Sequence, residues 1–130
     1  MNHPKISRLE ECHLWSEKLT KEMLFSSFDN IKNYRENYHN TRYLMKCKIC
    51  GLLYFAEFIE ITDFRDSNDN EYYSFIPVNS TEDADKLNTL SELELTSYLG
   101  IHMNFPPYNS NPFWLNLNSY IFLNRLTTAD

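Results

Sequence analysis

The sequence predicts an α+β fold, in which an N-terminal amphipathic helix packs on a small, mostly antiparallel sheet built on a central hairpin (about 52–62 and 71–78). Two short helices and a C-terminal strand complete this fold. Two observations predict it: apolar residues recur at helical spacing before residue 28, and two β-favouring apolar runs flank a polar connection. With 42% hydrophobic residues, the 130-residue chain fits a single domain, residues 1–130, with a core of its own.

The N-terminal pattern predicts a helix from Ile6 to about Phe28. Its apolar residues follow one another in steps of three or four, and charged residues fill the opposite side. These apolar residues are Leu9, Cys12, Trp15, Leu19 and Met23. Cys12 therefore falls on the apolar stripe, where a small core thiol is the usual role.

A second, shorter helix is predicted after this one. Asp29 or Asn30 is its candidate N-cap. The polar run at 37–41 then predicts a turn, and the apolar residues 43–45 predict the start of a strand.

The central hairpin consists of the runs 52–62 and 71–78. The first run is nearly continuous and apolar, so we expect a central strand that is buried on both faces for much of its length. The connection at 63–70 is polar. Pro77 cannot donate to a strand ladder, so the return strand should be at an edge there or already leaving the sheet.

Two capping boxes follow the hairpin. Ser80 and Ser91 each precede a carboxylate residue by three positions, which predicts two short helices, and Gly100 is a candidate C-terminal stop. We expect an irregular loop at 101–112 and a last strand from Phe113 to Leu117. Both helix starts carry clustered negative charge.

Acidic residues are concentrated in the second half of the chain. The net charge is −6, but residues 1–50 carry +3 and residues 51–130 carry −9. Between Glu57 and Glu94 there are eleven carboxylates and two cations. Such a surface repels nucleic acid and attracts basic proteins, although a merely solvated surface has the same composition.

A Cys-x-x-Cys-Gly turn at Cys47 and Cys50 is the clearest chemical motif. Two thiolates at this spacing suit two corners of a tetrahedral zinc site, and a strand after the turn is typical of a zinc ribbon. Because a second pair is missing, the other ligands would come from Cys12, His13, His39 or His102. The alternatives are free or core thiols, and redox catalysis, which a following helix would favour more than a strand does.

Several classes of function are disfavoured, and we expect no catalytic residues. The two glycines cannot form a phosphate-cradling loop, and no histidine lies beside a nucleophile in a recognised motif. The loop from Asp66 has EF-hand residue types at its first, third and fifth positions but lacks the glycine and the final glutamate. Without a signal-peptide core or an apolar run of roughly 18 residues, a cytoplasmic protein with no membrane partner is expected.

The stretch from Cys47 to Val78, followed by KLNTLSELEL, resembles a group of small bacterial proteins. It combines the Cys-x-x-Cys-Gly knuckle, an LYF strand, an acidic hairpin and an aromatic strand that ends in Ile-Pro-Val. Over about residues 43–117 the chain is similar to immunity proteins encoded beside contact-dependent or polymorphic toxins. The resemblance implies a non-enzymatic protein that neutralises a toxin domain, often a basic nuclease.

Charge and resemblance together predict a partner-binding surface around the hairpin loop and the next helix start. Its predicted residues are Asp63, Asp66, Asp69, Glu71, Tyr72, Glu82, Asp83 and Asp85. Two other functions suit the same features: a zinc-ribbon-like regulatory or adaptor protein, and a phage-encoded inhibitor of a bacterial nuclease system.

Overall fold

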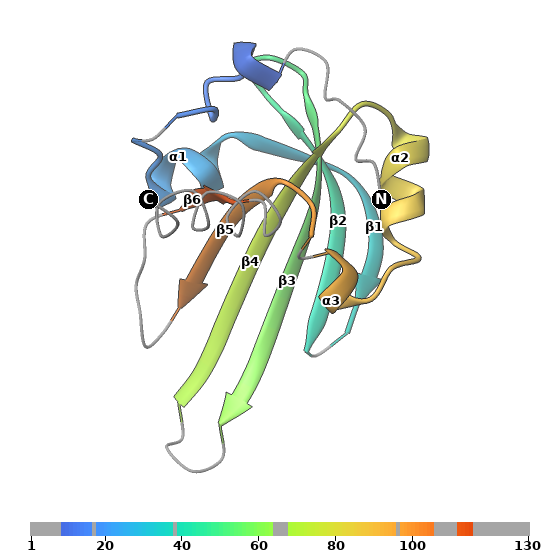
Figure 1. Cartoon of the computed structure of the whole chain (residues 1–130). Helices are drawn as coiled ribbons and strands as arrows, with labels where there is room; N and C mark the ends of the chain where they lie inside the picture. The colour runs from blue at the N-terminus through green and yellow to red at the C-terminus, as the bar shows by residue number, and fades with distance from the viewer. Residues whose placement is uncertain are drawn as a thin grey trace, which may run out of the picture.

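The computed structural model describes residues 9–16, 18–37, 39–63, 68–95, 97–105 and 112–115. Within them, six antiparallel strands follow the order of the sequence across one sheet (Figure 1). The strands are β1 (Phe28–Glu36), β2 (Asn40–Cys47), β3 (Leu53–Asp63), β4 (Asn68–Val78), β5 (Gly100–Phe105) and β6 (Phe113–Leu115). The helices are a 3-10 helix η1 (Leu9–Glu11), α1 (Lys21–Ser26), α2 (Thr81–Leu87) and α3 (Glu92–Leu95).

The predicted central hairpin is confirmed. β3 and β4 pair along their whole length, and their hairpin end extends beyond the other strands at the bottom of Figure 1. Aromatic and β-branched residues fill both strands, as a half-buried pleated surface favours. Pro77 lies past the last β4–β5 pair, Phe75 opposite Ile101, so it occupies a part of β4 that β5 no longer covers.

Alternate strand residues form two cores, one on each face of the sheet. The N-terminal face packs against the segment before β1, and its core residues are Cys12, Leu14, Leu19, Leu24, Cys47, Tyr54, Ala56, Phe75, Ile101 and Met103. The helical face packs against α2 and α3, and its core residues are Leu44, Phe55, Ile76, Val78, Ala84, Leu87 and Leu95. The sheet is thus a middle layer, which explains why β3 is apolar on both sides.

The predicted N-terminal helix from Ile6 to about Phe28 is wrong. η1 has only three residues. α1 has six and begins only after Thr20, whose hydroxyl accepts a hydrogen bond from a backbone N–H in the first turn of α1. Between them, Leu14 is fully buried although it lies off the predicted stripe, whereas Trp15, on the stripe, is 41% exposed. Packing against the sheet overrides a helical preference that is a weak prior.

The predicted second helix is also wrong, because the residues that Asp29 or Asn30 would have capped form β1. Most side chains of this edge strand are exposed, and two register shifts interrupt its pairing with β2. Irregular pairing and polar side chains are typical of edge strands that resist pairing with another chain. The predicted turn at 37–41 is confirmed, and the side-chain oxygen of Asn37 accepts two of its backbone N–H groups.

The expected loop at 101–112 instead begins with β5. Gly100 is therefore not a helix stop. It allows a close approach between strands, because a Cβ atom at this position would lie 2.8 Å from the backbone oxygen of Phe75. The last strand, β6, lies within the expected range from Phe113 to Leu117.

Both predicted helix starts after the hairpin are confirmed. The hydroxyls of Ser80 and Ser91 each accept a hydrogen bond from the backbone N–H three residues later, and the Glu94 carboxylate accepts a hydrogen bond from the N–H of Ser91 in return.

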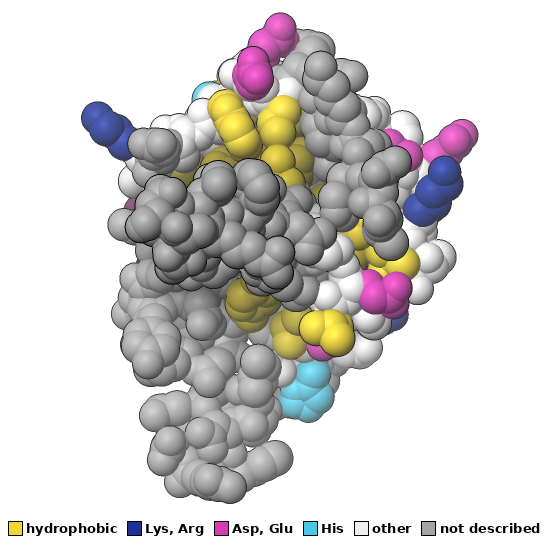
Figure 2. Space-filling model, in the orientation of Figure 1, with side chains coloured by type: hydrophobic (Ala, Val, Ile, Leu, Met, Phe, Trp, Pro, Cys, Tyr) yellow, Lys and Arg dark blue, Asp and Glu magenta, His cyan; other side chains and the backbone are white. Residues whose placement is uncertain are grey.

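In Figure 2, acidic and basic side chains lie next to each other in the region where Figure 1 places α2. None of the described helices is long and apolar enough to cross a membrane.

Candidate functional site

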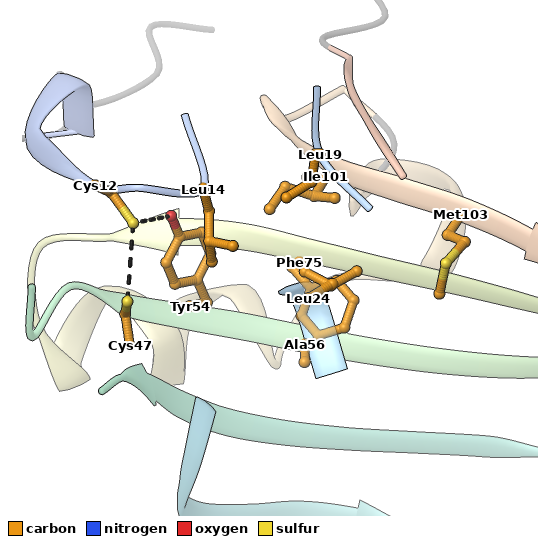
Figure 3. Close-up of a cluster of buried hydrophobic side chains, with 10 residues drawn as sticks. All are labelled: Cys12, Leu14, Leu19, Leu24, Cys47, Tyr54, Ala56, Phe75, Ile101 and Met103. Atoms are coloured by element: carbon orange, nitrogen blue, oxygen red, sulfur yellow. Dashed lines mark hydrogen bonds between the residues drawn. The ribbon is translucent and has the colours of Figure 1, made fainter. Parts of the chain in front are cut away.

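A cluster of cysteine and histidine side chains joins the N-terminal segment to the end of β2. The Sγ atoms of Cys12 and Cys47 are 3.9 Å apart, and Nδ1 of His13 is 3.6 Å from Cys47 Sγ. The three ligand atoms lie within 4.8 Å of one another, so the cluster could hold a metal ion such as zinc. Figure 3 shows Cys12 between Cys47 and Tyr54, whose hydroxyl donates to Cys12 Sγ at 3.2 Å.

The tautomer of His13 follows from its contact with Ser27. The Ser27 hydroxyl donates its proton to the carbonyl oxygen of Met23, so its oxygen accepts from His13 Nε2, 2.9 Å away. A proton on Nε2 leaves a lone pair on Nδ1, and Nδ1 is the atom that faces Cys47. A histidine that ligates a metal usually donates its other N–H to such a partner.

The turn after β2 brings Cys50 beside this cluster. Gly51 has a φ of 80°, which favours glycine, and its N–H donates to the Cys47 carbonyl at 2.9 Å. Burial acts to raise the pKa of Cys50, but hydrogen bonds with the Leu52 backbone and with the thiols of Cys12 and Cys47 outweigh it, and the pKa is lowered. Burial raises the pKa of Cys12 to about 12.

The predicted pair Cys47 and Cys50 therefore belongs to a larger group. The cysteine–histidine cluster consists of Cys12, His13 and Cys47, and Cys50 lies in the turn that follows Cys47. Its first two members come from the turn after η1 and not from a long helix. The other candidate ligands lie elsewhere: His102 contacts Tyr72 on the helical face, and His39 lies in the β1–β2 turn.

A shallow pocket opens at the other end of the N-terminal face, towards the tip of the β3–β4 hairpin. This hairpin pocket has a volume of about 150 Å³ and is lined by His39, Thr41, Phe58, Ile59, Glu60, Glu71 and Tyr73. The rings of Phe58 and Tyr73 are 4.8 Å apart, and the half-exposed Phe25 packs edge-on against Tyr73. The pocket thus combines aromatic walls with two carboxylates.

Sequence reasoning missed the relation between these two carboxylates. Glu60 and Glu71 are directly opposite each other on β3 and β4, an arrangement of like charges that destabilises a sheet. The Tyr73 hydroxyl donates to Glu71 at 2.7 Å, but among the described residues neither carboxylate forms an ion pair. The register of the hairpin could have revealed this pair, since pairing of Asp63 with Asn68 places Glu60 opposite Glu71.

Those predicted acidic residues whose side chains are described lie at two ends and on two faces of the sheet. The hairpin group is Asp63, Asp66, Asp69 and Glu71; Asp66 lies outside the described residues, and only the backbone of Asp63 and Asp69 is described. The helix group is Glu82, Asp83 and Asp85, on α2. β4 separates the groups; its 11 residues span about 34 Å. Because α2 covers the helical face and Glu71 lies on the other face, Glu71 and the helix group do not form one continuous surface.

Two of the predicted partner-binding residues are engaged within the fold. Asp85 accepts a hydrogen bond from the Tyr34 hydroxyl at 2.6 Å and pairs with Lys32 at 3.2 Å, and these contacts lower its pKa. Tyr72 is half-buried, its hydroxyl hydrogen-bonds to His102 Nδ1, and burial raises its pKa. Both side chains therefore already have partners inside the fold, as Glu71 does in the Tyr73 hydroxyl.

A buried ion pair on the helical face was also missed. Arg42 Nε is 2.7 Å from Glu57 Oε2, and both side chains are almost fully buried. The guanidinium also donates to the carbonyl oxygens of Asn88 and Leu90, which fixes the connection between α2 and α3 to the sheet. A carboxylate inside an apolar run signals such a pair, because a charge in a strand buried on both faces requires a buried partner.

The cysteine–histidine cluster and the hairpin pocket thus lie on the same face, at opposite ends of the central strands. Their ligands have to be inferred from their own chemistry, because the chain matches no family model, no curated protein and no solved structure.

Proposed function

We propose that this is a non-enzymatic binding protein whose hairpin pocket takes up a basic side chain of a partner protein. The observation that carries the proposal is the Glu60–Glu71 pair, two opposed carboxylates with no ion pair among the described residues. An arginine or lysine between them would form charge-assisted hydrogen bonds and relieve their repulsion. The rings of Phe58 and Tyr73 would add apolar and cation–π contacts.

The partner that suits this surface best is a basic toxin domain such as a nuclease, and the protein would be its immunity protein in the bacterial cytoplasm. Nucleases bind nucleic acid through basic surfaces, and the chain from Glu57 to Glu94 has a strong acidic excess. Complementary charge accelerates association and disfavours wrong partners. Such inhibition needs no catalytic residue.

The proposed interface includes the hairpin group and leaves out the helix group. An interface of ordinary size buries about 800 Å² on each partner. A flat patch of this area does not extend around the sheet to α2, which covers the opposite face.

The test is calorimetric titration, at low and at high salt, with the toxin domain that the proposal expects a neighbouring gene to encode. Glu60→Gln/Glu71→Gln should weaken binding about 10- to 100-fold and flatten its salt dependence, since it removes paired charges from the interface. Glu82→Gln/Asp83→Asn is the matched control, because it removes the same charge from the helix group; it should change the affinity by less than about threefold. If Glu60→Gln/Glu71→Gln, the pocket variant, bound the partner with wild-type affinity, the proposal would be refuted.

A zinc-containing regulatory or adaptor protein is the second candidate function, and the cysteine–histidine cluster favours it. In that case the partner would bind at the cluster end, so chelation would abolish binding and the pocket variant would not. A phage-encoded inhibitor of a bacterial nuclease would use the same pocket as an immunity protein. The neighbouring genes separate these two: a large secreted toxin indicates immunity, and phage genes indicate the inhibitor.

A further inference from the structure

We propose that the cysteine–histidine cluster is a structural zinc site whose four ligands are the Sγ atoms of Cys12, Cys47 and Cys50 and the Nδ1 atom of His13. Regular tetrahedral zinc, with bonds of about 2.3 Å to sulfur and about 2.1 Å to nitrogen, separates two sulfurs by about 3.8 Å and a sulfur from a nitrogen by about 3.6 Å. The corresponding separations here are 3.9 Å and 3.6 Å. This inference does not depend on the hairpin pocket or its partner.

The groups around the ligands are arranged as a zinc site requires. Ser27 holds the Nε2–H of His13, so the lone pair of Nδ1 is directed at Cys47 without any change of tautomer. Tyr54 is fully buried and donates its hydroxyl proton to Cys12 Sγ. A metal-bound thiolate accepts such a hydrogen bond better than a thiol does.

Cys50 is the natural fourth ligand. It lies in the same turn as Cys47, and Gly51 closes this turn with a conformation that few other residues adopt. Cys50 lies outside the group of three whose ligand atoms are within 4.8 Å of one another, and its side chain is only partly buried, so it would complete the site by a small movement within this turn. Four protein ligands leave no open position for water, which is the mark of a structural rather than a catalytic zinc.

The zinc would fix the N-terminal segment to the sheet. Cys12 and Cys47 are 35 residues apart, and between η1 and α1 the segment has no regular helix or strand among its described residues. Leu14 and Leu19, which this segment contributes to the core, depend on its being held in place. A metal that joins two distant segments binds the folded chain only, so its binding energy becomes folding energy.

The test begins with the wild-type full chain, purified without chelators. It should contain about one zinc per chain by elemental analysis. Replacement of zinc by cobalt(II) should give the visible absorption of a tetrahedral site with sulfur-to-cobalt charge transfer. Cys47→Ser should lose the metal, whereas His39→Gln, the matched histidine control, should keep it.

The Cys50→Ser variant tests the ligand set. It should reduce the cobalt charge-transfer intensity to about two thirds, the share of two thiolates in three, and weaken zinc binding at least about tenfold. Full intensity with wild-type zinc affinity would exclude Cys50 as a ligand. Folded wild-type protein that contains no zinc and takes up no cobalt would overturn the site, as would a Cys12–Cys47 disulfide. These wild-type measurements decide the matter even if a variant fails to fold.

Discussion

The two ends of the N-terminal face differ in how their polar side chains are satisfied. At the cluster end, Cys12, His13 and Cys47 face one another and have further partners inside the fold. At the hairpin end, Glu60 and Glu71 repel each other beside a pocket that is open to solvent. The first arrangement stabilises the fold. The second arrangement destabilises the fold, which is typical of a binding site whose charged side chains find their counter-charge on a bound molecule.

The same contrast is present within β3 alone. Glu57, on the helical face, is buried and paired with Arg42. Glu60, three residues later on the other face, forms no ion pair with any described residue. A carboxylate in this sheet thus serves either the fold or an interface, depending on the face on which it lies.

The largest predicted effect is on the cluster end. If free zinc is about 1,000-fold above its Kd, binding to the folded state alone adds about 4 kcal/mol to the free energy of unfolding. Chelation of the wild-type protein should therefore lower this free energy by about 4 kcal/mol, as measured by urea unfolding. Cys47→Ser should be insensitive to the chelator. An unchanged urea midpoint after chelation would show that no metal stabilises this end.

The next effect concerns the paired carboxylate of β3. Arg42→Met leaves Glu57 buried without a cation, which should cost about 3–5 kcal/mol of unfolding free energy in urea. Replacing both partners, in Arg42→Met/Glu57→Leu, should recover most of this loss, because no charge then remains in the core. If the single variant were as stable as the wild type, the pair would not hold the α2–α3 connection as described.

A smaller effect of opposite sign is expected at the hairpin end. Glu60→Gln/Glu71→Gln removes the like-charge pair and should raise the free energy of unfolding by about 0.5 kcal/mol. The same variant should lose affinity for the partner, so stability and binding would change in opposite directions. A clear loss of stability would mean that these carboxylates support the fold after all.

The smallest effect is the pH dependence of the helix group. Contacts with Tyr34 and Lys32 lower the pKa of Asp85 below its ordinary value of 3.8. The stabilising contribution of Asp85 is therefore present above that value and is lost as the pH falls through the lower pKa of the folded state. Asp85→Asn should lower the thermal midpoint slightly at neutral pH and not at a pH well below 3.8. Glu82→Gln, on the same helix, is the control. If the thermal midpoint of Asp85→Asn were still lower than that of the wild type at this acidic pH, the ionisation of Asp85 would not be the cause.

Short sequence patterns predicted the parts of the fold that depend on residues close together in the chain. The hairpin, the turn at 37–41 and the caps at Ser80 and Ser91 follow from short patterns of apolar residues, turn formers and hydroxyls. The N-terminal helix, β1 and β5 could not be predicted in this way. Leu14 is buried and Trp15 exposed because the sheet, which forms from later residues, determines which side chains of this segment face inward.

The candidate sites follow the same rule. Cys47 and Cys50 are recognisable because they share one turn, whereas Cys12 and His13 reach them only through the packing of the N-terminal segment. The Glu60–Glu71 pair depends on the register of β3 and β4, which the sequence leaves open until the loop length is known. The prediction of one acidic surface treated residues that are close in sequence as close in space, although β4 separates them.

The most direct test of the account is carboxyl footprinting of the wild-type protein. Its Asp and Glu side chains are labelled with and without the proposed partner, a basic toxin domain, and labelling is read at each residue by mass spectrometry. The proposed partner should protect Glu60 and Glu71 and leave Glu82 and Asp83 as reactive as in the free protein. Protection of Glu82 and Asp83 with unchanged labelling of Glu60 and Glu71 would contradict it.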